Sequence, residues 1–318
     1  MVDSKKQWKA WLYLSPVIIL TLVFTVYPIV NTLMMAFSND YILAIGSRQG
    51  LFYKGFGIDN FKMVLGYQGF MTGLKNTLLL TVITVPISTF LALLIAVCLN
   101  SIKAFNRLLQ TIYFLPYVTN TIAIGLVFST MFSMVGVGLT TENPIITTSG
   151  IINNVIELFG GKAINWVNEG SSWSANMFVM VVYIVWNALP FKILILLGGL
   201  QSVNKQYYDA AKVDGTSRTR TFFRITVPML SPMLAYVVIT GFIGGFKEYS
   251  SIVGVFGDNM GPTGSQYQMD TMVGFINRNI MDSNAHEGKA SAAALILFVI
   301  IFAVTMVNMY VSKKKVHY

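Results

Sequence analysis

The chain has 318 residues, of which 54% are hydrophobic and only 11% are charged. Soluble domains carry about 25% charged residues, so this composition excludes an ordinary soluble protein and predicts a membrane protein. A single cysteine excludes an internal disulfide bond, and two histidines add too little for a Cys/His metal site. The formal net charge of +9 would indicate nucleic-acid binding in a soluble protein, but the positions of the basic residues explain it differently.

Six stretches are apolar enough, and at about 20 residues or more long enough, to cross a bilayer as helices. They lie at 12–37, 76–99, 110–134, 176–200, 228–252 and 290–312. The first follows Lys5, Lys6 and Lys9, as the core of a signal peptide would, but it is longer than such a core and no small-residue cleavage site follows it. We therefore expect a retained first span and an all-α, polytopic membrane protein with one transmembrane domain over residues 1–318.

The basic residues concentrate in alternate connections between these spans. If the N-terminus lies in the cytoplasm, the cytoplasmic side also receives the connections after the second and fourth spans and the C-terminal tail. These segments are richer in Lys and Arg than the outer loops 38–75, 136–175 and 253–289. Because cytoplasmic connections of membrane proteins carry such an excess, we predict that both termini are cytoplasmic and that topology accounts for much of the net charge.

The segment YYDAAKVDGTSRTRTFFRITVP, at 207–228, is a charged stretch between two apolar runs. Asn204 can cap a short helix over 205–213, which Gly215 ends in a left-handed conformation. Thr216 or Ser217 can then begin a second short helix. Two short helices joined by a turn would form a compact projection, here called the knob, to which a cytoplasmic protein could bind. The alternative is an ordinary surface loop that obeys the positive-inside rule.

The same segment resembles the EAA loop of binding-protein-dependent ABC importer permeases. That loop reads Glu-Ala-Ala, three residues, Gly, nine residues, Ile, one residue and Leu-Pro. Here Asp209-Ala210-Ala211 is followed at the same spacing by Gly215, Ile225 and Val227-Pro228. The two departures, Asp209 for Glu and Val227 for Leu, are conservative.

The resemblance extends over nearly the whole chain. WNALPFKILILLGGLQSV, at 186–203, is similar to the helix before this loop in the carbohydrate branch of the family. LSPVIILTLVFTVYPIV, at 14–30, is similar to the first span of that branch, and YFLPYVTN, at 113–120, to its third. The chain resembles the type of the larger maltose-permease subunit. The resemblance implies a type I ABC importer permease fold and the import of a sugar or oligosaccharide by alternating access.

In this family the loop is a coupling helix that docks in a cleft of a cytoplasmic ATPase. The resemblance implies that the chain is no enzyme and holds no cofactor, because two partner ATPase subunits bind ATP and magnesium. It also implies a second, homologous permease subunit, an extracellular solute-binding protein and a place in the bacterial plasma membrane. The residues that we assign to ATPase coupling are Tyr208, Asp209, Ala210, Ala211, Asp214, Gly215 and Arg218.

A candidate solute path lies in the fifth span, where three glycines and a carboxylate share one helical face and would form a groove with a polar floor. These residues are Gly241, Gly244, Gly245 and Glu248. The alternative is close helix packing, which also requires small residues. Comparison with the larger maltose-permease subunit places these four positions on its sugar contacts, and adds three residues of the fourth span: Asn187, Ala188 and Phe191. The side chains differ from the maltose-binding set, so maltose itself is not implied.

Other functions are weighed against this one. The sequence has no Walker A motif, since FGGKA at 159–163 lacks the leading glycine and the Ser or Thr after the lysine. An ion-coupled secondary transporter would require several intramembrane carboxylates or broken helices in matched repeats, and Glu248 is the one such carboxylate we identify. A membrane enzyme or scaffold, and an importer permease for a solute other than a sugar, remain as alternatives. The identity of the solute is not settled by the sequence.

Overall fold

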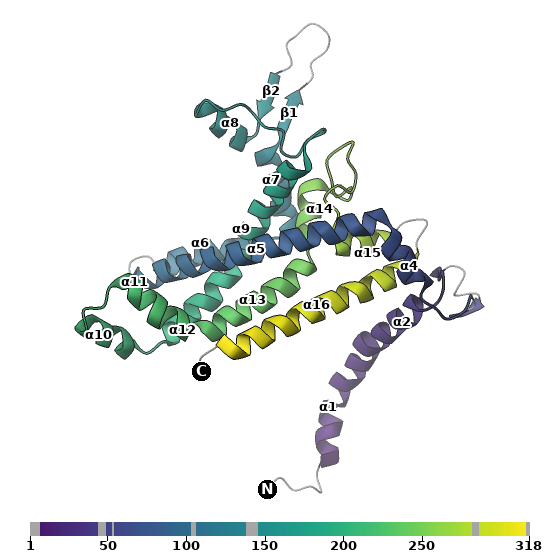
Figure 1. Ribbon diagram of the computed structural model, residues 1–318, viewed down its shortest axis with the longest axis horizontal. Helices are drawn as coiled ribbons and strands as arrows, with labels where there is room; N and C mark the ends of the chain where they lie inside the picture. The colour runs from purple at the N-terminus through teal and green to yellow at the C-terminus, as the bar shows by residue number, and fades with distance from the viewer. Residues whose placement is uncertain are drawn as a thin grey trace. The chain divides into compact units, whose positions relative to one another are not determined.

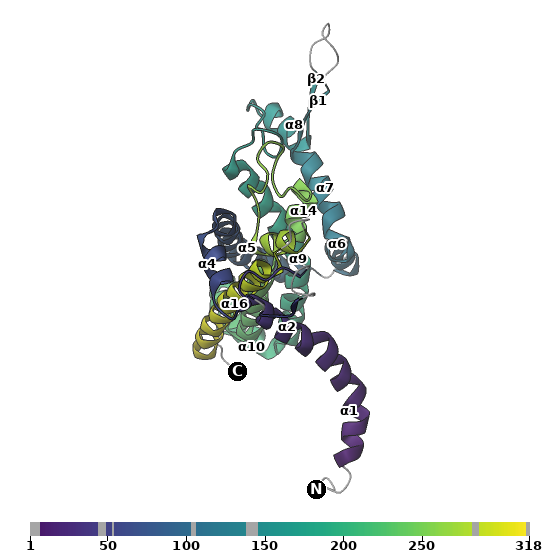
Figure 2. The same ribbon diagram turned by 90° about the vertical axis from the view of Figure 1, so that its right-hand side faces the viewer.

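The computed structural model describes residues 7–43, 49–52, 54–102, 106–137, 146–281 and 286–315 (Figures 1 and 2). Several basic residues used for the topology prediction, including Lys5, Lys6 and Lys103, lie outside these ranges. The chain divides into two compact units. Unit 1 comprises Met1–Phe70 and Phe275–Phe298, and unit 2 comprises Met71–Gly274 and Val299–Tyr318.

Unit 1 begins with α1 (Gln7–Thr21), η2 (Leu22–Val26) and α2 (Tyr27–Ala36), a long helical stretch whose apolar side chains are mostly exposed. Helix α4 (Asp59–Gly66) follows in the connection between the first two spans. Its buried Asn60 donates hydrogen bonds to the carbonyls of Ala36 (3.1 Å) and Ser38 (2.7 Å). The end of α2 leaves carbonyls without helical partners, so this amide stabilises the C-terminal end of the first span.

Helix α9 (Trp173–Ser202) of unit 2 contacts α6 (Asn106–Val118), α7 (Thr121–Phe132), α13 (Ser231–Phe246) and α14 (Ser250–Phe256). Three further helices, α5 (Gln68–Ser101), α15 (Met272–Met281) and α16 (Glu287–Lys315), are divided between the two units. Within the described residues, four helical stretches are long and apolar enough to cross a membrane, or up to six if two bent pairs each form one span. Each of the six predicted spans coincides with one of them, and the all-α fold class is confirmed.

Two spans are not the continuous helices that the sequence predicts. The third is bent by 97° between α6 and α7. At the bend Asn120 is extended, and its Oδ1 accepts hydrogen bonds from the N–H groups of Ile122 (2.8 Å) and Ala123 (3.3 Å). An asparagine in this position is an N-cap, so the side chain that begins α7 also stabilises the break.

The fifth span is interrupted twice. Its helices α11 (Arg218–Thr221), η3 (Phe222–Thr226) and α12 (Val227–Met229) meet α13 at a bend of 67°. Helix α13 then ends at Phe246, six residues before the predicted end of the span, and α14 begins at Ser250. Between them Glu248 Oε1 accepts the N–H groups of Tyr249 (3.1 Å) and Ser251 (3.0 Å).

Two prolines are preceded by the same irregularity. In η2 the N–H of Tyr27 donates to the carbonyl of Leu22, and in η3 the N–H of Val227 donates to that of Phe222. Both bonds span five residues, as in a π-helix, and both precede a proline directly, Pro28 or Pro228. A proline ring clashes with the carbonyl four residues before it, and the wider turn accommodates that carbonyl.

One end of unit 2 contains a hairpin that we did not predict. Strands β1 (Met134–Val137) and β2 (Ile146–Ser149) pair antiparallel, with Met134 opposite Ser149, and α8 (Ile151–Leu158) follows. Both views place the hairpin far from α10 (Lys205–Val213) of the charged loop (Figures 1 and 2). The two ends of this unit therefore carry the two kinds of connection that the charge pattern assigns to opposite sides of the membrane.

The interior of unit 2 contains two apolar clusters. One gathers residues such as Phe132, Met180 and Tyr183, and the other contains Leu196 and Leu200 of the later part of α9. The stretch of α9 between them, from Val185 to Lys192, contributes the polar and aromatic side chains described next. Along α9 the apolar packing is thus interrupted where the helix lines a cavity.

Candidate functional site

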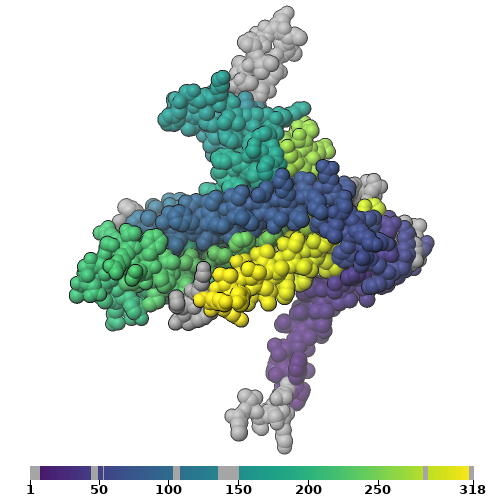
Figure 3. All heavy atoms as spheres, in the orientation of Figure 1, coloured from purple at the N-terminus to yellow at the C-terminus, as the bar shows by residue number. Residues whose placement is uncertain are grey.

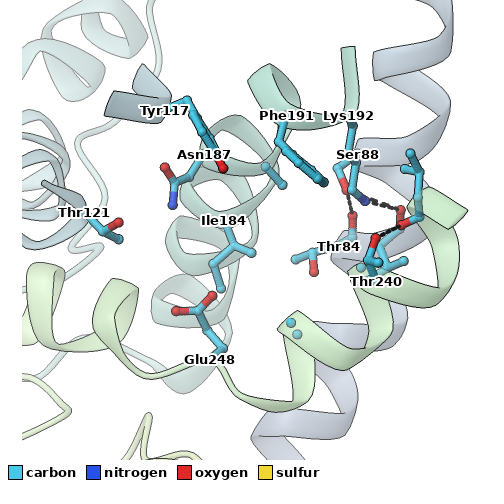
Figure 4. Close-up of a pocket in the computed structure, with 16 residues that line it drawn as sticks. Thr84, Ser88, Tyr117, Thr121, Ile184, Asn187, Phe191, Lys192, Thr240 and Glu248 are labelled. Atoms are coloured by element: carbon cyan, nitrogen blue, oxygen red, sulfur yellow. Dashed lines mark hydrogen bonds between the residues drawn. The ribbon is translucent and has the colours of Figure 1, made fainter. Parts of the chain in front are cut away.

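A cavity of about 400 Å³ opens within unit 2 (Figure 4). It lies among α5, the two halves of the bent third span, α9, α13 and the segment that follows α13. Its lining residues are Thr84, Val85, Ser88, Tyr117, Thr121, Ile184, Asn187, Ala188, Phe191, Lys192, Val237, Thr240, Gly241, Gly244, Gly245 and Glu248.

All seven residues predicted for the solute path line this one cavity. The structure brings together Asn187, Ala188 and Phe191 from α9 with Gly241, Gly244, Gly245 and Glu248 from the fifth span. The break after Phe246 places Glu248 in the cavity wall. That a solute passes here stays a prediction.

Polar groups without partners face the cavity. Among the described residues, the Asn187 amide and the hydroxyls of Thr84, Tyr117 and Thr121 have no hydrogen bond within the protein. Figure 4 shows Asn187, Thr121 and Glu248 directed toward one space. Donors and acceptors left free in a cavity are suited to a ligand with many hydroxyl groups, because a buried polar group without a partner costs free energy.

An aromatic pair forms one wall. The rings of Tyr117 and Phe191 lie with their centroids 5.8 Å apart and their planes inclined by 19°. Tyr117 comes from α6 and Phe191 from α9, so the pair joins two helices at the cavity. Flat apolar rings beside free hydroxyl and amide groups match the two kinds of surface on a sugar ring, its apolar face and its hydroxyl edge.

The three glycines of α13 have two different surroundings. A Cβ atom on Gly245 would lie 2.8 Å from Thr81 Cγ2, and one on Gly241 would lie 3.1 Å from Val85 Cγ1. These two glycines let α13 approach α5 closely. A Cβ on Gly244 would meet nothing within 4 Å. Close packing therefore accounts for two of the positions, whereas Gly244 leaves open space in the cavity.

Sequence reasoning missed the polar face of α5 and Lys192. Thr81, Ser88 and Thr89 are buried, and each hydroxyl donates to a carbonyl one turn earlier in the helix. Lys192 is 5% exposed and reaches Ser88 (2.7 Å) from α9. A lysine inside a predicted span was a signal in its own right.

The charged loop forms the predicted pair of short helices. The Asn204 side chain accepts the N–H of Gln206 (3.0 Å) and caps α10, and Ser217 caps α11 through the N–H of Arg220 (3.4 Å). Gly215 has a φ of 64°, as its place after α10 requires. The N–H of Thr216 donates to Ala211 O (2.9 Å), which closes the turn.

The predicted coupling residues separate into anchors and exposed positions. Ala211 is 6% exposed, and Tyr208 is half-buried with its hydroxyl 3.3 Å from Thr226 Oγ1. These two side chains pack α10 against neighbouring parts of the protein. The exposed positions are Asp209, Ala210, Asp214, Gly215 and Arg218. In Figure 3 this green segment forms one end of unit 2.

One exposed apolar residue of the knob was not predicted. Val213, the last residue of α10, is 88% exposed. It lies beside Asp214 and Gly215 at the turn, among charged neighbours. An apolar side chain so fully exposed at the tip of a short helix is a natural contact for a groove.

The fold and the cavity together define a polytopic membrane protein with a polar cavity between its helices and a helical knob at one end of unit 2. Residues 85–317 match the family described as binding-protein-dependent transport system inner membrane component. The chain belongs to this family, as the resemblance implied. Membership favours an importer permease over an ion-coupled transporter or a membrane enzyme.

The chain is similar to two characterised relatives along nearly its whole length. It is 25% identical to the lactose transport system permease protein LacF of Rhizobium radiobacter, over 96% of this chain and 94% of that protein. It is 29% identical to the arabinooligosaccharides transport system permease protein AraP of Halalkalibacterium halodurans, over 95% of this chain and 87% of that protein.

A solved structure confirms the fold. The chain superimposes on a chain of a bacterial ABC transporter involved in the import of the acidic polysaccharide alginate, with a TM-score of 0.75 over 98% of this chain and 96% of that one. The two sequences are 21% identical.

Proposed function

We propose that this chain is one permease subunit of an ATP-driven, binding-protein-dependent importer for a sugar or oligosaccharide. The observation that carries the proposal is the cavity, in which an aromatic wall, free amide and hydroxyl groups and the carboxyl group of Glu248 lie together. The relatives named for lactose and arabinooligosaccharides support a saccharide. The chain performs no chemistry, and its role is to open the cavity to each side of the membrane in turn.

Energy for the cycle would come from two partner ATPase subunits, which bind ATP and magnesium. The exposed knob at residues 209–218 supports this assignment, because it offers both charged residues and the apolar Val213 to a groove. A second, homologous permease subunit would complete the path, and an extracellular solute-binding protein would deliver the solute. A solved complex of the alginate transporter contains a periplasmic protein with bound alginate pentasaccharide, which supports this last partner.

The proposal is tested by purification and uptake together. A tagged chain, extracted from its own bacterium in mild detergent, should bring with it a second permease of similar length and an ATPase with a Walker A motif. Deleting the gene should abolish uptake of one saccharide, and ATP depletion should do the same in the wild type. Uptake that persists without ATP and collapses with the ion gradient would instead identify a secondary transporter.

Topology gives a direct prediction. We place both termini and the knob in the cytoplasm, and the segment after α8 outside. In a Cys98→Ser background, Lys162→Cys should react with an impermeant thiol reagent on intact cells, whereas Thr219→Cys should react only after the membrane is opened. Both side chains are exposed, so accessibility of the residue does not bias the result. The reverse pattern would invert the orientation.

Asn187 gives a test of solute binding. Its amide has no partner among the described residues and lines the cavity, so Asn187→Ala removes a contact to the solute without breaking one inside the protein. A lost hydrogen bond of about 1–2 kcal/mol corresponds to about a five- to thirtyfold rise in the apparent KM for uptake. The measurement is initial uptake rate against solute concentration.

The control for this variant is Asn165→Ala, in the outer loop, where the amide donates to Glu169 O at 2.7 Å and the residue does not line the cavity. Its KM should equal that of the wild type. An unchanged KM for Asn187→Ala, with normal complex assembly, would remove this residue from the path.

A further inference from the structure

A second cavity, of about 370 Å³, lies in unit 2 and shares no lining residue with the first. It is a groove bounded by α12 and α13 on one side and by the C-terminal part of α16 on the other. Its lining is apolar except for Ser231, Asn308 and Ser312. A volume of this size is within the range of ligand sites, about 300–1,000 Å³, but the apolar lining does not suit a sugar.

The groove is long and follows one face of α13. Ser231, Leu234, Ala235 and Val238 line it at positions i, i+3, i+4 and i+7, which share a helical face. From Ser231 to Ile239 the groove follows the helix for about 12 Å. Another transmembrane helix is about 10–12 Å across and would rest on the groove, whereas a single acyl chain is slim enough to enter it.

Basic side chains flank one end of the groove. Lys313 and Lys314 directly follow the lining residue Ser312, and Arg224 lies three residues before the lining residue Val227. All three basic side chains are exposed, and none forms an ion pair with another described residue. Figure 1 shows this end of α16 next to α12. It is the end of unit 2 that carries the knob, which we propose lies in the cytoplasm.

Polar groups without partners lie just inside this end. The Asn308 amide and the Ser312 hydroxyl line the groove and have no hydrogen bond within the described part of the chain. Asn308 precedes Lys313 by five residues, or about 7.5 Å of helix. The interfacial layer on each side of a bilayer is about 5–8 Å thick. With Lys313 at the level of lipid phosphates, the Asn308 amide therefore lies near the level of the ester carbonyls.

We propose that this groove binds one anionic phospholipid of the cytoplasmic leaflet. An acyl chain occupies the apolar groove, the Asn308 amide donates to an ester carbonyl, and Arg224, Lys313 and Lys314 surround the phosphate. Basic sites between helices on the cytoplasmic side are typical places for anionic headgroups. The inference goes beyond the proposed function and does not depend on it.

The position of the groove gives the lipid a structural role. Val227 and Pro228 line the groove before the 67° bend of the fifth span, and Ser231 and Leu234 line it after the bend. One acyl chain would therefore contact both segments. A ligand that binds only the folded protein raises its stability, so the lipid should stabilise this bend between the knob and α13.

The test measures lipid binding to the purified complex that contains the full chain. The complex is delipidated in detergent and titrated with dioleoyl phosphatidylglycerol or dioleoyl phosphatidylcholine, and bound lipid is counted by native mass spectrometry. The anionic lipid should bind the wild type at least tenfold more tightly. Removing both lysines, in Lys313→Gln/Lys314→Gln, should weaken it about thirtyfold, because each basic residue near a membrane surface contributes about fivefold. Equal affinity for the two lipids, or an unchanged affinity in this variant, would overturn the site.

Two variants separate the headgroup from the acyl chain. Lys313→Arg/Lys314→Arg keeps both charges and should bind the anionic lipid within about threefold of the wild type. Ala235→Phe keeps every charge but fills the groove, and it should weaken the anionic lipid about tenfold or more. The matched control is Lys162→Gln/Lys247→Gln, which removes two exposed lysines that do not adjoin the groove. A loss in this control as large as in Lys313→Gln/Lys314→Gln would assign the effect to total charge and contradict the site.

Thermal unfolding gives an independent readout. Phosphatidylglycerol should raise the unfolding temperature of the wild type, and this shift should be lost in Lys313→Gln/Lys314→Gln and in Ala235→Phe. An equal shift in all three forms would overturn the proposal.

Cross-linking in intact cells identifies the occupant directly. A photoreactive phenylalanine analogue in place of Ala235 should form an adduct of the mass of a phospholipid. An adduct with a second protein would show that a subunit covers the groove and would overturn lipid binding. The same residue in place of Ile156, which lies in α8 and does not line the groove, is the control.

Discussion

Replacing Gly215 by valine should abolish uptake while leaving the chain in the membrane. Gly215 has a φ of 64°, and a β-branched residue is strained there by about 1–2 kcal/mol or more. The strain falls on the turn that holds α10 against α11, so the knob loses its shape. The expected measurement is normal membrane abundance, loss of ATPase in the purified complex and no uptake above background.

The matched control is Gly160→Val. Gly160 also has a positive φ, of 81°, and also has nothing within 4 Å of a Cβ position, but it follows α8, in a connection that we propose lies on the opposite side of the membrane from the knob. The same backbone strain at that place should leave ATPase association intact. Full uptake by Gly215→Val, with a normal amount of ATPase in the purified complex, would contradict the assignment of the knob to ATPase coupling.

Val213 sharpens this test, because it separates docking from folding. Val213→Asp places a charge on a side chain that is 88% exposed, so it should weaken ATPase association without disturbing α10. Ala211→Asp places a charge where the side chain is 6% exposed, and it should destabilise the knob itself. The first variant should keep the protease resistance of the knob, and the second should lose it.

Gly244→Leu should block transport while the complex still assembles. A Cβ on Gly244 meets nothing within 4 Å, so the leucine side chain has room to extend into the cavity. If it crowds the solute at a cost of about 1–3 kcal/mol, uptake falls about five- to 150-fold. The measurement is uptake, with ATPase co-purification as the test of assembly.

The neighbouring glycine gives the contrasting result. A Cβ on Gly245 would lie 2.8 Å from Thr81 Cγ2, so Gly245→Leu should force α13 away from α5 and lower the amount of folded complex. Gly244→Ala, which adds one methyl group to open space, should transport nearly as well as the wild type. Normal transport by Gly244→Leu would mean that the solute does not pass this face of α13.

The spans and the knob were predictable because their signals are local. Long apolar runs give helices in a membrane protein, and Asn204, Gly215 and Ser217 each act within a few residues of the chain. The breaks in the third and fifth spans were not predicted. In the sequence, Asn120 is one polar residue in an apolar run. Its capping hydrogen bonds to α7 form only because the chain bends at this residue. Glu248 was placed on a continuous helix that would have carried it about 30 Å from Pro228, whereas the real helix ends at Phe246.

Only part of the lining of the cavity could be predicted from the sequence. The glycines and Asn187 stand out in apolar segments, whereas the hydroxyls of α5 do not, because serine and threonine are common in helices whose hydroxyls bond to their own backbone. Lys192 was missed for a different reason. Its acceptors, Ser88 and Thr89, lie more than a hundred residues earlier in the chain. No pattern in a single sequence indicates that these side chains contact Lys192.

The wide turn of η3 lies between the knob and α13, and it has a consequence for how the two are aligned. A five-residue hydrogen bond inserts one residue beyond the ordinary helical repeat, and each residue of an α-helix corresponds to a rotation of about 100°. The faces of α11 and of the helix after Pro228 are thus out of phase by one position. A helical wheel drawn through residues 218–229 as one regular α-helix would misplace the residues beyond η3 by about 100°, and deleting one residue from 222–226 should rotate the two ends of this stretch relative to each other by that amount.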